Sequence, residues 1–243
     1  RKKVITAFSG IIIVAIVAFD LIRFGWKFTP FTAVEYFFPQ TRVIDFLQSL
    51  PKPFRVISTD PKLLPPNVAA YYGIEDISGY DPVIADRYEE LLASIARNTP
   101  DITPPFGFNR IVTLEHVDTR LLQLLGVRYI LSLKDLHEEN VRLVFQEGES
   151  RIYEIQGSSP RVYFAQRYLV RTSKQNVIDS LFDPLFKSGQ HAVIENGPQP
   201  VLQYFSDSFG ATSYITMYSP SKIELSTQAG DFTRLLVILN RFD

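Results

Sequence analysis

The first hydrophobic feature of the chain is an apolar run of about 19 residues, Val4–Ile22. A helix of this length can cross the hydrocarbon core of a bilayer. Three basic residues precede the run, and Arg23, Trp26 and Lys27 follow it, where an interfacial anchor is expected. We therefore predict a transmembrane helix with its anchor over residues 1–27, with the N-terminus in the cytoplasm and the rest of the chain outside.

Two alternatives for this run remain open at the level of sequence. A cleaved signal peptide is one, although the run is long for such a segment and Asp20 disrupts the small-residue cleavage site. A helix buried in a globular core is the other, although the run offers too few polar residues for a solvent-facing side. The transmembrane reading is the one we favour.

Residues 28–156 alternate between helical and strand-like patterns, which is typical of a mixed α/β region. Asp118 is a predicted N-cap for a helix that runs through Leu121–Leu125 and that Gly126 ends. The other predicted elements are a helix at 41–50, strands at 54–58 and 127–133, and a hairpin of strands at 141–146 and 152–155.

A second helix is predicted from Pro82 to Arg97. Asp81 suits the N-cap, and Pro82 suits the first helical position because that position needs no backbone N–H. The apolar residues recur at helical spacing and predict a buried stripe. These residues are Ile84, Tyr88, Leu91, Leu92 and Ile95.

The segment Gly157-Ser-Ser-Pro160 marks the predicted boundary of a β-rich subdomain over residues 157–243. A long strand at 161–170, a helix capped by Ser173 and a short strand at 192–195 come first. Strands at 201–205, 212–218, 222–229 and 234–240 then predict a meander or half-sandwich. The predicted fold class is α+β: one N-terminal transmembrane helix, a mixed α/β extracytoplasmic region, then this subdomain.

Composition and motifs exclude several kinds of function. A net charge of −1 gives no electrostatic case for binding nucleic acid, and the absence of cysteine excludes disulfides and thiolate metal sites. The three histidines are isolated, no nucleotide-binding loop is present, and no carboxylate spacing marks an acid/base pair. The sequence therefore predicts no cofactor and no metal, and it identifies no catalytic residue.

The stretch from Asn67 to Tyr88 is the densest in tyrosines, carboxylates and glycines. Tyrosine rings offer faces for sugar rings, and acidic or basic side chains can hydrogen-bond hydroxyls or a phosphate. Two structural readings stay open: Asp81 as an N-cap and Arg87 as an ion-paired helix residue. The candidate substrate-binding residues are Asn67, Tyr72, Asp76, Tyr80, Asp81, Arg87 and Tyr88.

Several pieces of the chain, in order, resemble the extracytoplasmic part of the YfhO-like bacterial multi-pass membrane proteins. Their order and spacing cover most of residues 20–240, and residues 67–88 are the specific part. The pieces are Asn67 with Tyr-Gly-Ile up to Ile74, the motif Asp-Ile-Ser-Gly-Tyr-Asp over 76–81, Arg87-Tyr88, Leu124–Leu131, Arg151–Glu154, Pro160-Arg161 and the strand Leu235–Leu239.

This resemblance implies a glycosyltransferase-like protein of the GT-C class in the bacterial cytoplasmic membrane. Proteins of that class take sugars from polyprenyl-phosphate donors at the outer face of the membrane, and family members are linked to glycosylation of cell-surface polymers such as teichoic acids. Their acidic catalytic residue lies in an early extracytoplasmic loop, so the resemblance places catalysis outside this chain.

We therefore expect an extracytoplasmic domain that helps a membrane glycosyltransferase to hold its lipid-linked donor or its cell-surface glycopolymer. The expected partners are the lipid bilayer and these two ligands. The alternative is a non-enzymatic interaction or assembly domain, in which the tyrosines of residues 67–88 are buried in a rigid, turn-rich core. Exposure of these tyrosines beside a cleft distinguishes the two hypotheses.

Overall fold

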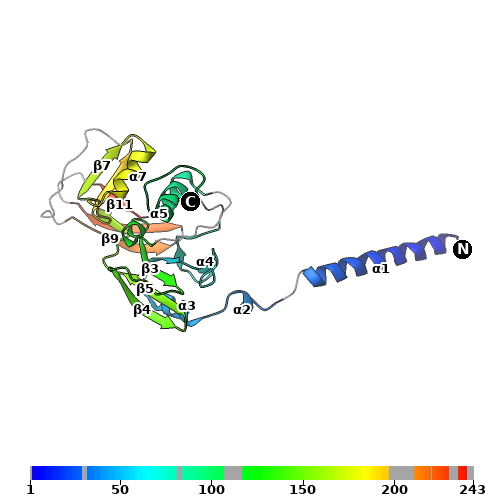
Figure 1. Ribbon diagram of the computed structural model, residues 1–243. Coiled ribbons are helices and arrows are strands. Elements are labelled where there is room, and N and C mark those ends of the chain that lie inside the picture. The colour runs from blue at the N-terminus through cyan, green and yellow to red at the C-terminus, as the bar shows by residue number, and fades with distance from the viewer. Residues whose placement is uncertain are drawn as a thin grey trace. The chain divides into compact units, whose positions relative to one another are not determined.

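The protein is described here by a computed structural model (Figure 1), in which the chain divides into two compact units, residues 1–40 and 41–243. The described residues are 2–28, 32–80, 84–106, 117–196, 211–219, 221–229 and 235–239.

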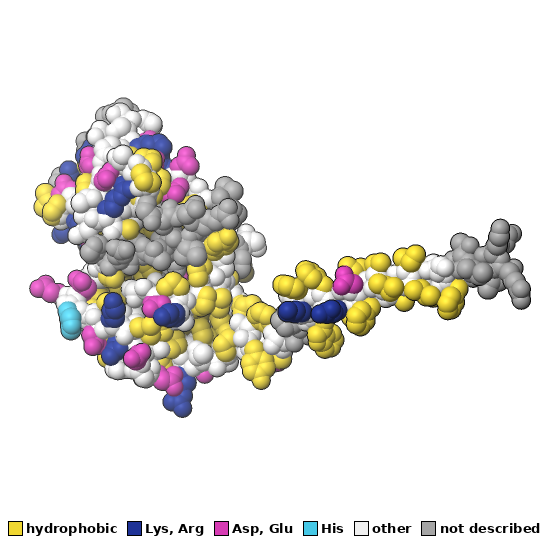
Figure 2. Space-filling model, turned by 45° about the vertical axis from the view of Figure 1, so that its right-hand side comes forward, with side chains coloured by type: hydrophobic (Ala, Val, Ile, Leu, Met, Phe, Trp, Pro, Cys, Tyr) yellow, Lys and Arg dark blue, Asp and Glu magenta, His cyan; other side chains and the backbone are white. Residues whose placement is uncertain are grey.

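The first unit contains the helix α1 (Lys2–Phe28) and a single helical turn, α2 (Val34–Phe37). Residues 8–28 of α1 have a mean hydropathy of 2.1, and none of them is buried. Figure 2 shows hydrophobic side chains along both edges of this helix. The buried-core alternative is therefore wrong, and the helix is long and apolar enough to cross a membrane, although a signal sequence would have the same length and composition.

We predict that Trp26, the only tryptophan of the chain, reports on an interfacial position of α1. Its side chain is 76% exposed within the protein, so a bilayer would be its main neighbour if α1 spans it. In the full chain in lipid nanodiscs, we expect lipids brominated near the carbonyl groups to quench Trp26 more strongly than lipids brominated at the chain ends. Emission at the wavelength of a hydrated indole, with no quenching by either lipid, would contradict the membrane assignment.

The second unit is organised on a five-stranded sheet with the order β2-β1-β3-β5-β4. The central strand β1 is parallel to both β2 and β3, whereas β5 is antiparallel to β3 and to β4. The strands are β1 (Arg55–Ser58), β2 (Glu75–Asp76), β3 (Val127–Ser132), β4 (Val141–Glu147) and β5 (Ser150–Ile155). The predicted strands at 54–58 and 127–133 and the predicted hairpin are confirmed.

Four helices accompany this sheet: α3 (Arg42–Ser49), α4 (Val68–Tyr71), α5 (Asp86–Arg97) and α6 (Thr119–Leu124). The Thr41 side chain caps α3 by accepting a hydrogen bond from the backbone N–H of Ile44. Asp118 caps α6 by accepting from two backbone N–H groups of its first turn, as predicted. Gly126 has a φ of +70° after the end of α6, a conformation that glycine adopts without strain.

Apolar side chains from β1, β3 and β5 meet those of α5 and α6 in one buried core. The helical stripe of α5 contributes Leu92 and Ile95, both fully buried, as its spacing predicts. The cluster comprises Ile57, Ile77, Leu92, Ile95, Leu121, Leu122, Leu125, Val127, Ile130, Tyr153 and Ile155.

The start of α5 differs from the prediction. The helix begins at Asp86, and Ala85, in an extended conformation, occupies the N-cap position. Asp86 and Glu89 place negative charge in the first turn, which stabilises a helix that begins there. Ile84 therefore precedes the helix, whereas the predicted cap Asp81 lies outside the described residues.

The described residues of the rest of the unit form three small two-stranded sheets. The strands β7 and β8 are parallel, and the helix α7 lies between them in the sequence. The strands β9 and β10 form an antiparallel hairpin, and the last described strand, β11, pairs with β6. The elements are β6 (Val162–Phe164), β7 (Arg167–Arg171), α7 (Lys174–Phe182), β8 (His191–Glu195), β9 (Thr212–Ser219), β10 (Lys222–Gln228) and β11 (Leu236–Ile238).

One strand prediction in this part is wrong, one is modified, and one falls outside the described residues. The single strand predicted at 161–170 is broken, because the N–H of Ala165 bonds to Leu235 and that of Gln166 to Gln190, in different sheets. The predicted meander is interrupted, since β11 pairs with β6 rather than with β10. The predicted strand at 201–205 lies outside the described residues. The domain boundary at 157 stays a prediction, and α+β is the observed class.

Candidate functional site

Asn67 joins the start of the turn-rich stretch of residues 67–88 to Tyr80, in the loop after β2. Its side-chain amide donates to the backbone oxygen of Tyr80 at 2.8 Å, and its Oδ1 accepts from the Tyr80 N–H at 3.1 Å. The φ of Asn67 is 68°, in the left-handed region that asparagine tolerates better than most residues. The side chain thus acts as a clamp that fixes the loop after β2.

Asp76 has a comparable local role at the end of β2. Its carboxylate accepts from the backbone N–H of Ser78 at 2.9 Å and from the Ser78 hydroxyl at 2.7 Å. This is the arrangement by which aspartate stabilises a turn two residues ahead of itself. Ser78 is buried, so this carboxylate helps to hold the loop inside the unit.

The three candidate tyrosines do not form one surface. Tyr72 is only 7% exposed and packs edge-to-face against Tyr71, with ring centroids 5.2 Å apart. Tyr88 is half-buried and donates its hydroxyl to the Ile77 carbonyl at 2.7 Å. Tyr80 is 45% exposed, and the neighbouring Tyr71 is 58% exposed. The expectation that Tyr72 presents its ring to a sugar is therefore wrong.

Arg87 is ion-paired, as the structural alternative predicts. Its guanidinium contacts Glu90 at 3.0 Å and Glu195 at 2.8 Å, which ties α5 to β8. Lys174, at the start of α7, also contacts Glu90 at 2.8 Å. With Asp81 outside the described residues, the candidates of residues 67–88 are engaged mainly in holding the fold together.

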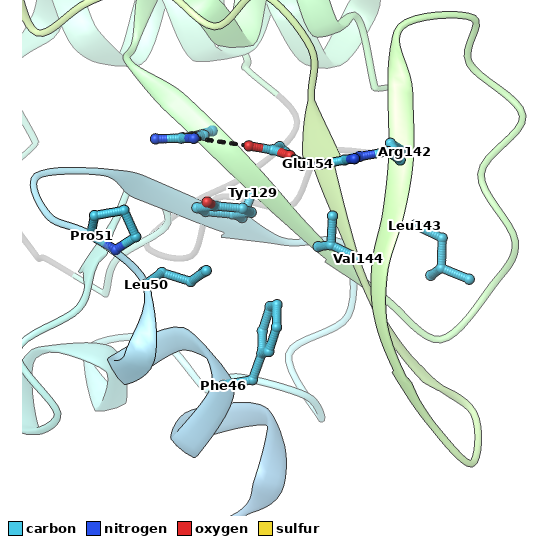
Figure 3. Close-up of a pocket in the computed structure, with 9 residues that line it drawn as sticks. Phe46, Leu50, Pro51, Tyr129, Arg142, Leu143, Val144 and Glu154 are labelled. Carbon is cyan, nitrogen blue, oxygen red and sulfur yellow. Dashed lines mark hydrogen bonds and ion pairs between the residues drawn. The ribbon is translucent and has the colours of Figure 1, made fainter.

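The structure offers a different site, a hollow of about 530 Å³ on the antiparallel half of the main sheet. We call it the larger hollow, because a second one, described below, has a smaller volume. Figure 3 shows Phe46 pointing from α3 toward the strands, with Arg142 and Glu154 side by side beyond Tyr129. The lining residues are Phe46, Leu50, Pro51, Arg128, Tyr129, Arg142, Leu143, Val144 and Glu154.

Two arginines in this larger hollow share one carboxylate. Arg128 donates to Glu154 Oε1 at 3.0 and 3.1 Å, and Arg142 donates to Oε2 at 2.7 Å. The hydrogen bonds from Arg142 and Arg128 outweigh burial and keep the pKa of Glu154 below its usual value, so this group is anionic at neutral pH. The Arg128 guanidinium also lies over the Tyr129 ring, 5.5 Å from its centroid.

The opposite wall of the larger hollow is apolar. Phe46 stacks on Phe145 with ring centroids 4.9 Å apart, and Val144 points from β4 toward the hollow (Figure 3). A hollow with one apolar wall and one cationic wall has the general character of sites for small ligands. Sequence reasoning missed it because its polar residues meet only through strand register, in which Arg142 lies opposite Glu154.

A smaller hollow of about 210 Å³ lies next to the first, and Arg128 lines both. Its residues come from the ends of strands and from the segment that precedes β6. They are Pro53, Phe54, Gly126, Arg128, Ser158, Ser159, Pro160 and Arg161.

Arg161 belongs to a partly buried polar network around Glu75. The guanidinium groups of Arg55 and Arg161 each contact Glu75 Oε2 at 3.0 Å. Tyr218 donates its hydroxyl to the other oxygen of Glu75 and accepts from Arg161 at 2.7 Å. This network joins β1, β2 and β9 to the segment before β6.

The described residues include no group of three or more histidine or acidic side chains that could hold a metal ion. Comparison with models of known protein families, with curated proteins and with solved structures found no match. The resemblance to the YfhO-like proteins therefore stays an expectation.

Proposed function

We propose that residues 41–243 form a ligand-binding domain, held by α1 at the outer face of a bacterial cytoplasmic membrane. In this proposal the domain assists sugar transfer from a polyprenyl-phosphate donor to a cell-surface polymer by holding one of these ligands. The chemistry itself is carried out by residues outside this chain.

The observation that carries the proposal is the larger hollow, in which an apolar wall faces two arginines. A sugar ring needs an apolar surface for its C–H face and fixed hydrogen-bond donors for its hydroxyl groups. Phe46 and Val144 supply the first, and Arg142, whose side chain is 63% exposed, supplies the second. The volume of about 530 Å³ lies in the usual range for such ligands.

The second candidate function is a non-enzymatic interaction or assembly domain at the membrane. It is favoured by the stretch from residue 67 to 88, whose polar side chains mostly bond within the domain. Burial of Tyr72 and the clamp between Asn67 and Tyr80 are what a rigid structural core requires. In this alternative the larger hollow receives a side chain of a protein partner rather than a sugar.

We predict that Arg142→Ala in the full-length protein lowers the sugar content of the cell-surface polymer by about tenfold, the loss expected for one hydrogen bond to a charged group. The Arg142 side chain is largely exposed, so the change should not unfold the domain. The measurement is the ratio of sugar to polymer backbone in purified cell envelopes, at matched protein levels in the membrane.

Arg97→Ala is the matched control, because Arg97 is an ion-paired arginine on α5 that lies in neither hollow. It should leave the sugar content unchanged. If Arg142→Ala also leaves it unchanged, while the protein remains folded and in the membrane, the assisting role in sugar transfer is wrong. Loss of a co-purifying protein in that variant would then support the interaction domain.

A further inference from the structure

We infer that the smaller hollow binds a tetrahedral oxyanion, the phosphate group of a ligand. The inference rests on the proposed function, since it identifies the anionic end of a ligand whose remaining part occupies the larger hollow. It depends on three features of the described residues: unbalanced charge, pre-positioned donors and continuity between the hollows.

The charge around the two hollows is unbalanced in the same way twice. Glu75 lies between Arg55 and Arg161, and Glu154 lies between Arg128 and Arg142. Each group therefore has two guanidinium charges and one carboxylate charge, which leaves one positive charge in each. Each guanidinium contacts a carboxylate, so the excess is one positive charge in each group, and an anion placed between the two groups would balance it.

One donor of the Glu75 group has no acceptor. Arg55 is only 6% exposed, and its Nη2 atom is buried with no hydrogen-bond partner among the described residues. Arg55 does not line the smaller hollow, so it contributes positive charge behind the hollow rather than a contact with a ligand. Burial, followed by repulsion from Arg161, lowers the pKa of Arg55 in spite of the contact with Glu75. The protein thus holds more positive charge at this place than its own carboxylates neutralise.

The two arginines that reach the smaller hollow, one from each group, are held in place before any ligand arrives. Arg161 is 7% exposed and is fixed by Leu239, to whose carbonyl its Nε donates at 2.9 Å, and by Tyr218. Arg128 is fixed by two hydrogen bonds to Glu154. Guanidinium groups suit phosphate because they present several N–H donors in one plane.

The remaining lining of the smaller hollow is also compatible with an anion. Ser158 and Ser159 supply hydroxyl donors, and none of the described lining residues is acidic. At Gly126, a Cβ atom would lie 3.2 Å from Arg161 Cδ, so a glycine there leaves room for the arginine. A volume of about 210 Å³ accommodates one phosphate group with water around it.

Arg128 connects the two hollows because it lines both of them. A phosphate bound beside Arg161 and Arg128 would therefore direct its substituent toward the larger hollow, between Phe46 and Arg142. This places a phosphorylated sugar, or the head of a phosphate-bearing lipid, along one continuous surface.

The experiment uses the full chain in phosphatidylcholine nanodiscs and inorganic phosphate as the probe. Binding is followed by broadening of the ³¹P resonance, with chloride added to keep the ionic strength constant. We expect Arg128→Gln to weaken phosphate binding at least tenfold and Ser158→Ala to weaken it less, the order of effect expected for charged and neutral hydrogen bonds. Arg97→Gln is the matched control and should bind phosphate like the unmodified protein.

A second arm identifies the source of the phosphate. Nanodiscs that contain phosphatidic acid should abolish binding of free phosphate if a lipid head group occupies the smaller hollow. They should leave it unchanged if the ligand is a soluble phosphorylated sugar. Both outcomes support an oxyanion site, and they assign its occupant.

Equal phosphate affinities of the unmodified protein, Arg128→Gln and Ser158→Ala, or no binding by any of them, would overturn the inference. The proposed function is judged separately. If phosphate does not bind but Arg142→Ala still lowers the sugar content of the polymer, the oxyanion site is wrong and the assisting role stands. If phosphate binds as expected and the sugar content does not change, the oxyanion site stands and the assisting role is wrong.

Discussion

Replacing Glu75 by alanine is expected to lower the free energy of unfolding by about 3 kcal/mol, because the substitution leaves two buried arginines without their carboxylate partner. Among the described residues, Glu75 is the only carboxylate that contacts either Arg55 or Arg161. Both arginines are more than nine-tenths buried. Without Glu75, two guanidinium groups would remain in the interior with no anion near them.

The measurement is urea unfolding of the full chain in detergent, followed by circular dichroism. Glu139→Ala is the matched control, because Glu139 is exposed and forms no ion pair among the described residues. Its effect should stay within about 0.5 kcal/mol. A Glu75→Ala protein as stable as the control would mean that the network around Glu75 does not hold the unit together.

The pH dependence of stability gives the same prediction a second readout. Burial alone would raise the pKa of Glu75, but hydrogen bonds from Tyr218, Arg161 and Arg55 outweigh it, and the pKa lies below its ordinary value of 4.5. A lowered pKa in the folded state adds stability above pH 4.5 that is lost as the pH falls below it. The difference in stability between the unmodified protein and Glu75→Gln should therefore shrink on acidification. Parallel curves would contradict this role of the carboxylate.

Local signals in the sequence predicted the elements of the fold well. The caps Asp118 and Ser173 both accept hydrogen bonds from the first turn of their helices, as their residue types indicate. The hairpin between β4 and β5 turns at Gly148, where the sequence places a turn. These features depend on residues a few positions apart, so a single sequence contains the information that determines them.

Features that depend on distant residues could not be predicted in the same way. The pairing of β11 with β6 joins segments about 75 residues apart, and nothing local indicates it. The larger hollow likewise depends on the register in which β4 pairs with β5. A shift of one residue in that register would turn Arg142 away from Glu154 and remove the site.

The candidate tyrosines show the same limit at short range. Tyr71 and Tyr72 are neighbours at the end of α4, yet the first is 58% exposed and the second is 7% exposed. Their residue type is identical, so only the orientation of one helical turn on the unit decides which ring meets solvent. The polar and aromatic density of residues 67–88 therefore indicated a structured loop, and it did not indicate which side chains a ligand could reach.

The second large effect is expected in the hydrophobic core, where Leu92→Ala should lower the free energy of unfolding by about 2–5 kcal/mol. Leu92 lies on α5, has no exposed surface, and belongs to the cluster that joins this helix to Ile130 of β3. The substitution removes apolar contacts and leaves a cavity, because α5 is also held by Ile95 and by the ion pairs of Arg87 and cannot collapse freely onto the sheet.

Leu185→Ala is the matched control for Leu92→Ala, since the same atoms are removed from a side chain that is 75% exposed. Its effect should stay within about 0.5 kcal/mol. Equal effects at the two positions would mean that α5 is not packed on the main sheet. Two assignments would then be wrong together, because the same helix places all of these side chains: the core contributed by α5 and the position of Arg87 between Glu90 and Glu195.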